Sequence, residues 1–254
     1  MTTAAELASY ASSFPSFRNK IINGNLSNPI NQRGAASITT PSSGSTGYTY
    51  DRWYYDGSTA TPYLYQGIED KNVNNGTYVI SWEGSGINAA WKVSTDTTAG
   101  NGPDATTGFT SVSNGGTFTV NEGTEYSKHL WIRFDGTLAN LDKVMVEEGT
   151  VATPFEHRPY GTELALCQRY YEVIPRIYIG SQNSTVNFTN IRHTMTYATQ
   201  KRTSPAITYG TITAGYSVST LTTNSTHLII EIGHSGTADF RPGITTNTTI
   251  SAEL

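Results

Sequence analysis

The sequence predicts an all-β protein, in which a short helix precedes a β-sandwich and a smaller C-terminal β domain follows it. Uncharged polar residues dominate, because only 36% of residues are hydrophobic and 14% are charged. The 16 Tyr, 8 Phe and 4 Trp supply large surfaces to bury, and a Thr- and aromatic-rich chain favours pleated sheet. Short alternating segments separated by Gly and Asn turns indicate antiparallel strands. At 254 residues the chain is long enough for two modest domains or one large sandwich.

Residues 1–16 are predicted to form the helix. A Thr-x-x-Glu capping box begins at Thr3, and Pro15 ends the helical pattern. Leu7, Tyr10 and Phe14 fall at helical spacing and form an apolar stripe. Because a helix of about eleven residues is marginal alone in water, the stripe must pack on something. Either it docks on its own domain, or it serves attachment and trimerisation as a three-stranded bundle or a plug into a larger assembly.

Three segments between residues 17 and 160 supply the predicted core residues: 77–84 and 128–136, where apolar residues fall at alternate positions, and 140–149, which closes the series. Their predicted core residues are Tyr78, Ile80, Trp82, Leu130, Ile132, Phe134, Leu141, Val144 and Val146. Trp131 falls on the face opposite Leu130 and Ile132. Trp53, within "YDRW", is also predicted to be in the core.

The stretch "TPFEHRP" (153–159) is predicted to close the sandwich. Its two prolines cannot donate ladder hydrogen bonds, so the segment suits a last edge. Phe155 offers an apolar anchor, and Glu156 and Arg158 are expected to pair on the surface. The following "TELALCQ" is long enough for two helical turns, with Cys167 as a small buried residue. Strand patterns then return up to the end of the chain.

Charge and hydropathy patterning exclude several kinds of partner. The net charge is −4 and there is no run of Lys or Arg, so no electrostatic footprint for nucleic acid is visible. The apolar runs are too short for membrane insertion. The start of the chain lacks the pattern of a secretory signal, and a single cysteine cannot form an internal disulfide. These features are more typical of release by lysis than of ordinary secretion.

Several segments resemble the jelly-roll modules of bacteriophage tail-fibre and related prophage proteins. They are "NKIINGNLSNPINQRG" (19–34), "YTYDRWYYDG" (48–57), "GTYVISWEGSG" (76–86), the long run from "FTVNEG" to "CQRYY" (118–171) and the terminal "ISAEL". The long run is the most specific, because the turn, the Pro-bounded "TPFEHRP" (residues 153–159, hereafter the clip) and Cys-Gln-Arg-Tyr-Tyr follow in one order. The resemblance is strong over residues 19–171 and weaker over 172–254.

The resemblance implies a carbohydrate-binding-module-like jelly roll at 17–160, a connector at 161–171 and a C-terminal β tip domain at 172–254. It also implies an intertwined homotrimer that joins a phage tail, baseplate or fibre-adaptor protein through its N-terminus. Such a protein is made in the host cytoplasm, becomes part of the virion tail fibre and acts at the host cell surface. The chain departs from a long-fibre pattern because it shows no coiled-coil or β-helical shaft, which favours a compact fibre or tip.

Motifs for catalysis are scarce, so we expect no enzyme and no cofactor. "GHSG" (233–236) is not a G-x-S-x-G nucleophile elbow, and the five histidines form no H-x-x-x-H pair. Asp96 and Asp104 in the Gly-rich loop 96–104 are the only metal candidates, since a structural calcium ion needs several converging oxygen ligands.

Sugar binding is a more specific hypothesis than catalysis or metal binding. Pyranose rings stack their apolar faces on aromatic side chains, while amides and carboxylates bind the hydroxyls. The candidate contacts are Trp91, Tyr54, Tyr55, Tyr63, Tyr65, Tyr178, Tyr209 and Tyr216. The first five are expected to be exposed. A place in the core or in an interface is the alternative for each of the eight.

The function expected from the sequence is recognition of a host surface polysaccharide or lipopolysaccharide by multivalent, non-catalytic binding. Two alternatives stay open. One is a structural tail or baseplate component that joins or caps fibres without binding a receptor. The other is a polysaccharide depolymerase or its accessory module.

Overall fold

The computed structural model describes residues 17–41, 44–69, 72–94, 107–121, 129–175, 177–178, 190–212, 216–234 and 243–253. The predicted helix at 1–16, with Leu7, Tyr10 and Phe14, lies outside the described residues, as do Asp96 and Asp104. Within the described ranges the chain is mostly strand, and its α-helix is α2 (Tyr160–Gln168). The prediction of an all-β protein is therefore confirmed.

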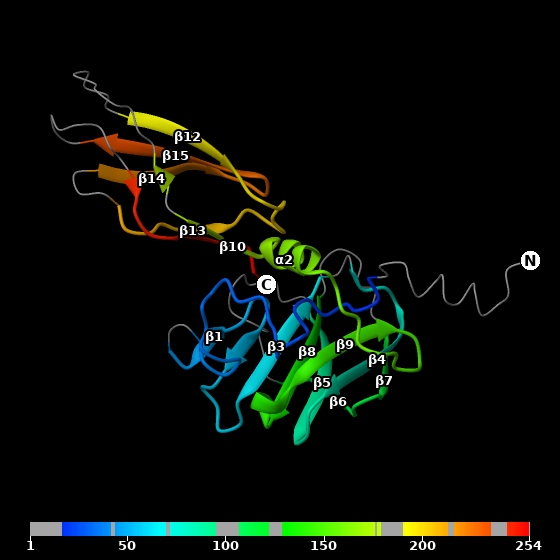
Figure 1. The fold of residues 1–254 in the computed structure, drawn as a ribbon. Coiled ribbons are helices and arrows are strands. Elements are labelled where there is room, and N and C mark those ends of the chain that lie inside the picture. Colours follow the sequence, from blue (N-terminus) through cyan, green and yellow to red (C-terminus); the bar gives the residue numbers. More distant parts are fainter. Residues whose placement is uncertain are drawn as a thin grey trace, which may run out of the picture.

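Two antiparallel sheets face each other in the N-terminal part (Figure 1). The six-stranded sheet has the order β1 (Thr46–Tyr48), β2 (Tyr54–Asp56), β3 (Tyr63–Ile68), β8 (His129–Gly136), β5 (Ile87–Ser94), β6 (Thr110–Val112). The three-stranded sheet has the order β7 (Thr117–Val120), β4 (Gly76–Glu83), β9 (Asp142–Glu148). A 3-10 turn, η2 (Leu138–Asn140), connects β8 to β9.

The core of this sandwich includes the residues that the strand pattern predicts. All nine predicted core residues of the three segments are buried in one cluster, together with Trp53. Aromatic rings join the two sheets, since Trp82 of β4 meets Phe134 of β8 edge to face at 5.6 Å. Burying side chains of this size contributes about 1.5–3 kcal/mol each, which makes the sandwich a stable platform for its outer surface.

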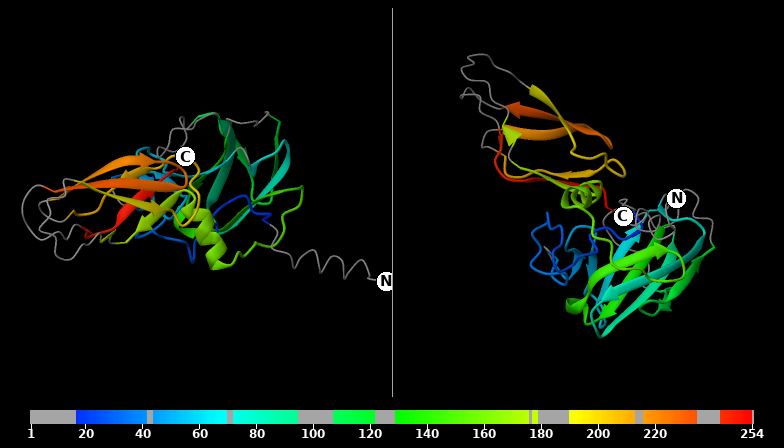
Figure 2. Two further views of the ribbon diagram at one scale, coloured as in Figure 1. Left: turned by 90° about the horizontal axis from the view of Figure 1, so that it is seen from above. Right: turned by 45° about the vertical axis from the view of Figure 1, so that its right-hand side comes forward.

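A second group of strands follows the helix and has a core of its own. One sheet has the order β10 (Tyr171–Ile174), β17 (Thr248–Ser251), β13 (Ala206–Thr208), and another has the order β12 (Asn190–Thr196), β15 (His227–His234), β14 (Tyr216–Thr223). β11 (Ile177–Tyr178) pairs with β16 (Gly243–Ile244). Their core contains Tyr197, Leu228, Ile230, Ile232, Ile244 and Ile250. These strands lie apart from the sandwich, with α2 between them (Figure 1 and Figure 2).

Helix α2 joins the two parts and packs on the sandwich. Cys167 and Tyr170 are buried against Ile22 and Ile30 of the N-terminal segment. The predicted burial of Cys167 is confirmed, and the predicted two turns of helix form with a start at Tyr160.

A buried ion cluster ties the last residues of the chain to the sandwich. The Glu253 carboxylate, 0% exposed, contacts the Arg52 guanidinium and lies 2.7 Å from Nη2 of Arg33. Arg52 also lies 3.5 Å from the centroid of the Tyr170 ring. A further ion pair joins Arg169, just after α2, to Glu69 of the sandwich, with Nη2 and Oε2 3.0 Å apart. The joint between the two parts is therefore charged and paired, and its central pair, Arg52 and Glu253, is shielded from water.

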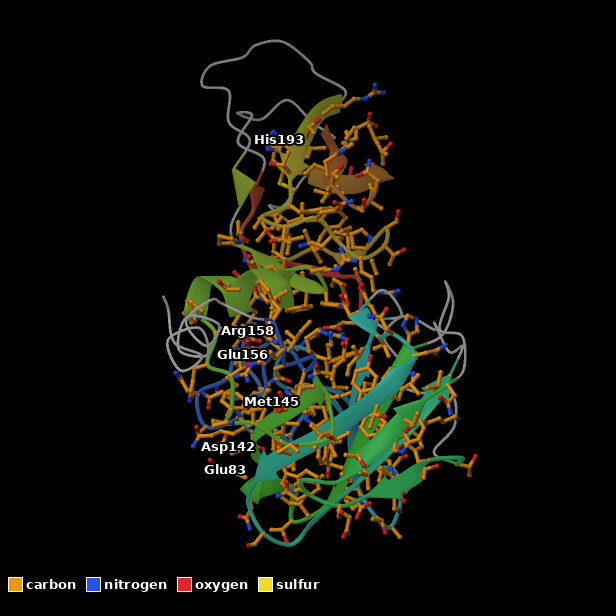
Figure 3. The ribbon with its side chains drawn as sticks, turned by 90° about the vertical axis from the view of Figure 1, so that its right-hand side faces the viewer. Glu83, Asp142, Met145, Glu156, Arg158 and His193 are labelled. Carbon is orange, nitrogen blue, oxygen red and sulfur yellow. The ribbon has the colours of Figure 1, made fainter. Side chains whose placement is uncertain are left out.

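The expected surface pair of Glu156 and Arg158 is instead largely buried. The two groups lie 3.6 Å apart, and their side chains are only 11% and 6% exposed. Arg158 donates to the main-chain carbonyls of Asn19 and Ile21, and Glu156 accepts from the main-chain N–H of Asn19. The pair is buried because the clip closes over the N-terminal segment, at the junction of α2 and the sandwich (Figure 3).

Candidate functional site

A row of tyrosines crosses the outer face of the six-stranded sheet. Tyr48 of β1 lies opposite Tyr54 of β2, which lies opposite Tyr65 of β3. Tyr65 in turn lies opposite Arg133 of β8. Directly opposed residues share a face of the sheet, so their side chains interact. The rings of Tyr48 and Tyr54 meet edge to face with centroids 5.3 Å apart.

The neighbouring row, one residue along each strand, points into the core. Tyr55 lies opposite Leu64, and Leu64 lies opposite Phe134. Leu64 and Phe134 are fully buried, and the half-buried Tyr55 packs against the same core cluster. Successive side chains of a strand alternate between faces, so Tyr54 and Tyr55 cannot share one. Both tyrosines were expected to be exposed; each is partly exposed, but they lie on opposite faces, and Tyr55 packs against the core.

Further side chains widen the row into an outer aromatic face, which consists of Tyr54, Tyr63, Tyr65, Phe109, Trp131 and Arg133. The rings of Tyr63 and Phe109 each lie 5.9 Å from the ring of Tyr65. The Arg133 guanidinium lies 4.4 Å from the Tyr63 centroid and 4.7 Å from the Phe109 centroid. Two cation–π contacts therefore hold both rings in place.

The outer aromatic face has a buried floor and an accessible rim. Tyr65 and Trp131 are each only 1% exposed, whereas Tyr54, Tyr63 and Phe109 are partly exposed. The prediction that Tyr65 is exposed is wrong, because the ring of Phe109 packs against it and Arg133 lies opposite it on β8. Burial raises the pKa of Tyr65, and the Arg133 guanidinium opposes the rise only in part. Its phenol therefore stays protonated under the rim.

The loop segment that carries Phe109 is anchored to the sheet. Lys92 of β5 donates to the Thr107 carbonyl at 3.1 Å, two residues before Phe109. The Lys92 ammonium also lies 5.8 Å from the Phe109 centroid. The Phe109 ring therefore lies between the cations of Lys92 and Arg133. A side chain that is already ordered loses little conformational freedom when a ligand binds, which favours affinity.

Trp91 lies on the other face of the same sheet. Its cross-strand partner is the core residue Ile132, and its ring stacks on Phe118 with centroids 4.9 Å apart. Trp91 is half-buried rather than openly exposed, because it closes the edge of the sandwich. It lines a recess of about 300 Å³ together with Thr119 and Asn121. Trp91 therefore belongs to a second, smaller surface.

The C-terminal candidates do not join either surface. Tyr209 and Tyr216 are half-buried and pack against the second core. Burial raises the pKa of Tyr209, whose hydroxyl shares a hydrogen bond with Thr220. Tyr178 lies in β11, where its backbone pairs with Gly243. The alternative of a core role is thus favoured for Tyr209 and Tyr216.

Three members of the outer aromatic face were not among the predicted contacts: Trp131, Arg133 and Phe109. The sequence does contain a signal for Trp131 and Arg133. Both alternate with core residues in "KHLWIRFDG", so they fall together on the outer side of the sheet. Phe109 follows a long Gly-rich loop, and no periodicity in the sequence places it.

Within the described part of the chain, no cluster of three or more His, Cys, Asp or Glu side chains is arranged to hold a metal ion. None of the described helices has the length and apolar character needed to cross a membrane.

Comparisons with protein-family models, with curated proteins and with solved structures find no match for this chain. The proposed function therefore rests on the sequence resemblance and on the geometry of the protein itself.

Proposed function

We propose that the protein is a bacteriophage or prophage tail-fibre protein that binds a host surface glycan without catalysis. The tail-fibre assignment rests on the sequence resemblance, and the observation that carries the glycan-binding part of the proposal is the outer aromatic face, where the partly exposed rings of Tyr54, Tyr63 and Phe109 gather around Arg133. Aromatic rings offer stacking surfaces to the apolar faces of sugars, and a guanidinium donates to their hydroxyl or carboxylate oxygens.

The rigidity of the sheet supports this role. Sites built on strands hold side chains more precisely than sites on loops. Tyr54, Tyr63 and Arg133 stand on three neighbouring strands, β2, β3 and β8, with Tyr65 and Trp131 packed beneath them. A ligand therefore meets a surface that is already arranged.

The sandwich is proposed to be a carbohydrate-binding-module-like jelly roll, and the fibre an intertwined homotrimer. It attaches to a phage tail, baseplate or adaptor protein through its N-terminus and acts as part of the virion at the host cell surface. It needs no cofactor, although Asp96 and Asp104 remain candidates for a structural calcium ion. Three copies raise the apparent affinity of a weak sugar contact through effective concentration.

The homotrimer gives the first prediction. Light scattering of the purified protein is expected to yield three times the mass of one chain. The physical reason is that an intertwined assembly buries surface that a single sandwich leaves open. A mass equal to that of one 27.5 kDa chain would contradict the fibre assignment.

Glycan recognition gives the second prediction. Fluorescently labelled protein is expected to sediment with host cells and to stop doing so when surface polysaccharide or lipopolysaccharide is stripped from them. Tyr63→Ala is expected to weaken this binding, whereas Trp91→Ala and Tyr216→Ala test the other two surfaces. Loss in only one of the latter two would move the contact to the sandwich edge or to the C-terminal domain.

One alternative has a structural observation in its favour. The buried ion cluster of Arg33, Arg52 and Glu253 fixes the two parts of the chain to each other, as a fibre joint or cap requires. That role predicts binding to the tail or baseplate and no binding to cells, stripped or intact.

A further inference from the structure

A polar recess of about 230 Å³ lies away from the outer aromatic face, beside the clip that closes the sandwich. Four asparagines of the segment 19–28 line one side, and residues 155–163 line the other. Glu156 and Arg158 mark its place in Figure 3, between α2 and the N-terminal segment. Its size suits one sugar ring rather than a drug-sized ligand, for which pockets usually exceed about 300 Å³.

The floor of this clip recess is rigid, because its buried amides are already paired. Asn19 donates to the Val144 carbonyl at 3.0 Å and accepts from two main-chain N–H groups. Asn23 donates to the Ile30 carbonyl at 2.8 Å and accepts from the main-chain N–H of the same residue at 2.7 Å. Amides paired in this way position the recess and take no part in binding.

The rim carries the groups that remain available. Tyr160 is 71% exposed at the start of α2, and Asn28 is also exposed. The Tyr160 hydroxyl and the Asn28 amide make no hydrogen bond to any described residue. The Asn25 amide oxygen accepts from Ser27, which leaves its two N–H donors without a partner in the described part of the chain. The exposed Tyr160 ring offers a surface on which a sugar ring can stack. The two neighbouring amides offer hydrogen-bond partners for the hydroxyls of that sugar.

The charges of the recess select a neutral ligand. Its guanidinium, Arg158, is paired with Glu156 at 3.6 Å and with Glu163 at 3.2 Å. Two carboxylates against one guanidinium leave the lining slightly acidic, so an acidic sugar would be repelled. The Arg158 Nε–H is a buried donor with no partner among the described residues, and an unpaired buried donor favours a polar ligand or an ordered water.

We infer that the clip recess is a second saccharide site, which binds one neutral pyranose ring. The ring stacks on Tyr160, and its hydroxyls bind the amides of Asn25 and Asn28. The inference rests on the proposed function for the class of ligand, but it shares no residue with the outer aromatic face. A substitution that removes binding at one site is therefore expected to leave the other site unchanged.

Saturation-transfer NMR tests the inference with four neutral sugars at millimolar concentration: D-glucose, D-galactose, N-acetyl-D-glucosamine and L-rhamnose. At least one is expected to receive saturation from the wild-type protein. The signal is expected to fall several-fold in Tyr160→Ala and in Asn28→Ala, and to persist in Tyr160→Phe, which keeps the ring. Arg192→Ala, in β12 of the C-terminal strands and in neither surface, is the matched control and should retain it, and Tyr63→Ala reports any contribution of the outer aromatic face.

The remaining outcomes separate the two proposals. A signal lost in Tyr63→Ala but kept in Tyr160→Ala would overturn the clip site and leave the proposed function standing. No saturation signal from any of the four sugars would also overturn the clip site. So would an equal loss of signal in Tyr63→Ala and Tyr160→Ala when the circular dichroism of both variants is unchanged. A stronger Tyr160-dependent signal from D-glucuronic acid would overturn the assignment of a neutral ligand.

Discussion

Replacement of Arg52 by alanine is expected to lower the free energy of unfolding by about 3–5 kcal/mol, because it leaves a buried charge without its partner. Arg52 is 1% exposed, contacts the fully buried Glu253 carboxylate and donates to the Gly67 carbonyl. Arg33 alone would then have to balance Glu253 from a partly exposed position. Urea unfolding of the two proteins measures the difference.

The matched control is Arg192→Ala. Arg192 also pairs with a carboxylate, that of Glu231 at 3.2 Å, but its side chain is 72% exposed. Exposed pairs of this kind contribute about 0–1 kcal/mol. Equal losses of stability in Arg52→Ala and Arg192→Ala would show that the joint does not depend on the buried cluster.

Acidification is expected to stabilise the protein through Asp51, which lies in the same joint. Burial raises the pKa of Asp51 from 3.8 to about 6, although hydrogen bonds from Gln32 and the charge of Arg33 oppose the rise. The folded state therefore holds this proton more tightly than the unfolded state does. The stabilisation is complete below pH 4 and is lost as the pH rises through 6, with an amplitude of about 3 kcal/mol.

The measurement is the difference in unfolding free energy between wild type and Asp51→Asn, followed from pH 4 to pH 7. Other titrating groups are common to both proteins, so the difference isolates Asp51. Wild type should gain stability relative to Asp51→Asn as the pH falls. A flat difference, or a gain on raising the pH, would contradict the predicted proton binding by Asp51.

The same residues connect the joint to the outer aromatic face. The Arg33 guanidinium lies 3.6 Å from the Tyr171 centroid and 4.7 Å from the Tyr48 centroid. Tyr48 in turn contacts Tyr54, a partly exposed ring of the outer aromatic face. Loss of the cluster is therefore expected to disturb the edge of the glycan surface as well as the joint.

The core strands could be predicted because their information is local. Tyr78, Ile80 and Trp82 alternate within one strand, and alternation alone indicates which face of a sheet is buried. Leu130 and Phe134 follow the same rule. The assignment of these segments required no knowledge of their partners.

The joint could not be predicted in this way. Arg52 and Glu253 are separated by 201 positions, and neither "DRW" nor "ISAEL" shows a periodicity that links them. The residue types of Glu156 and Arg158 predict a surface pair, because charged residues usually remain at the surface. They are buried because a distant segment, which includes Asn19 and Ile21, supplies their remaining partners.

The candidate site was predictable in part. Tyr54 and Tyr63 do share the outer aromatic face, but Tyr55 points inward and Tyr65 forms its floor. The direction of Tyr55 follows from strand alternation. The depth of Tyr65 depends on Phe109, whose position is set by a contact between segments far apart in the sequence.

The most direct test of glycan recognition is calorimetric titration of wild type and a Tyr63→Ala/Phe109→Ala double variant with polysaccharide purified from the host surface. Removal of two aromatic anchors is expected to weaken binding at least about ten-fold, since each such anchor commonly contributes more than 1 kcal/mol. The single variant Tyr209→Ala, in the C-terminal domain, should bind like wild type. Equal affinity of the double variant and wild type would contradict the assignment of the outer aromatic face as the receptor-binding surface.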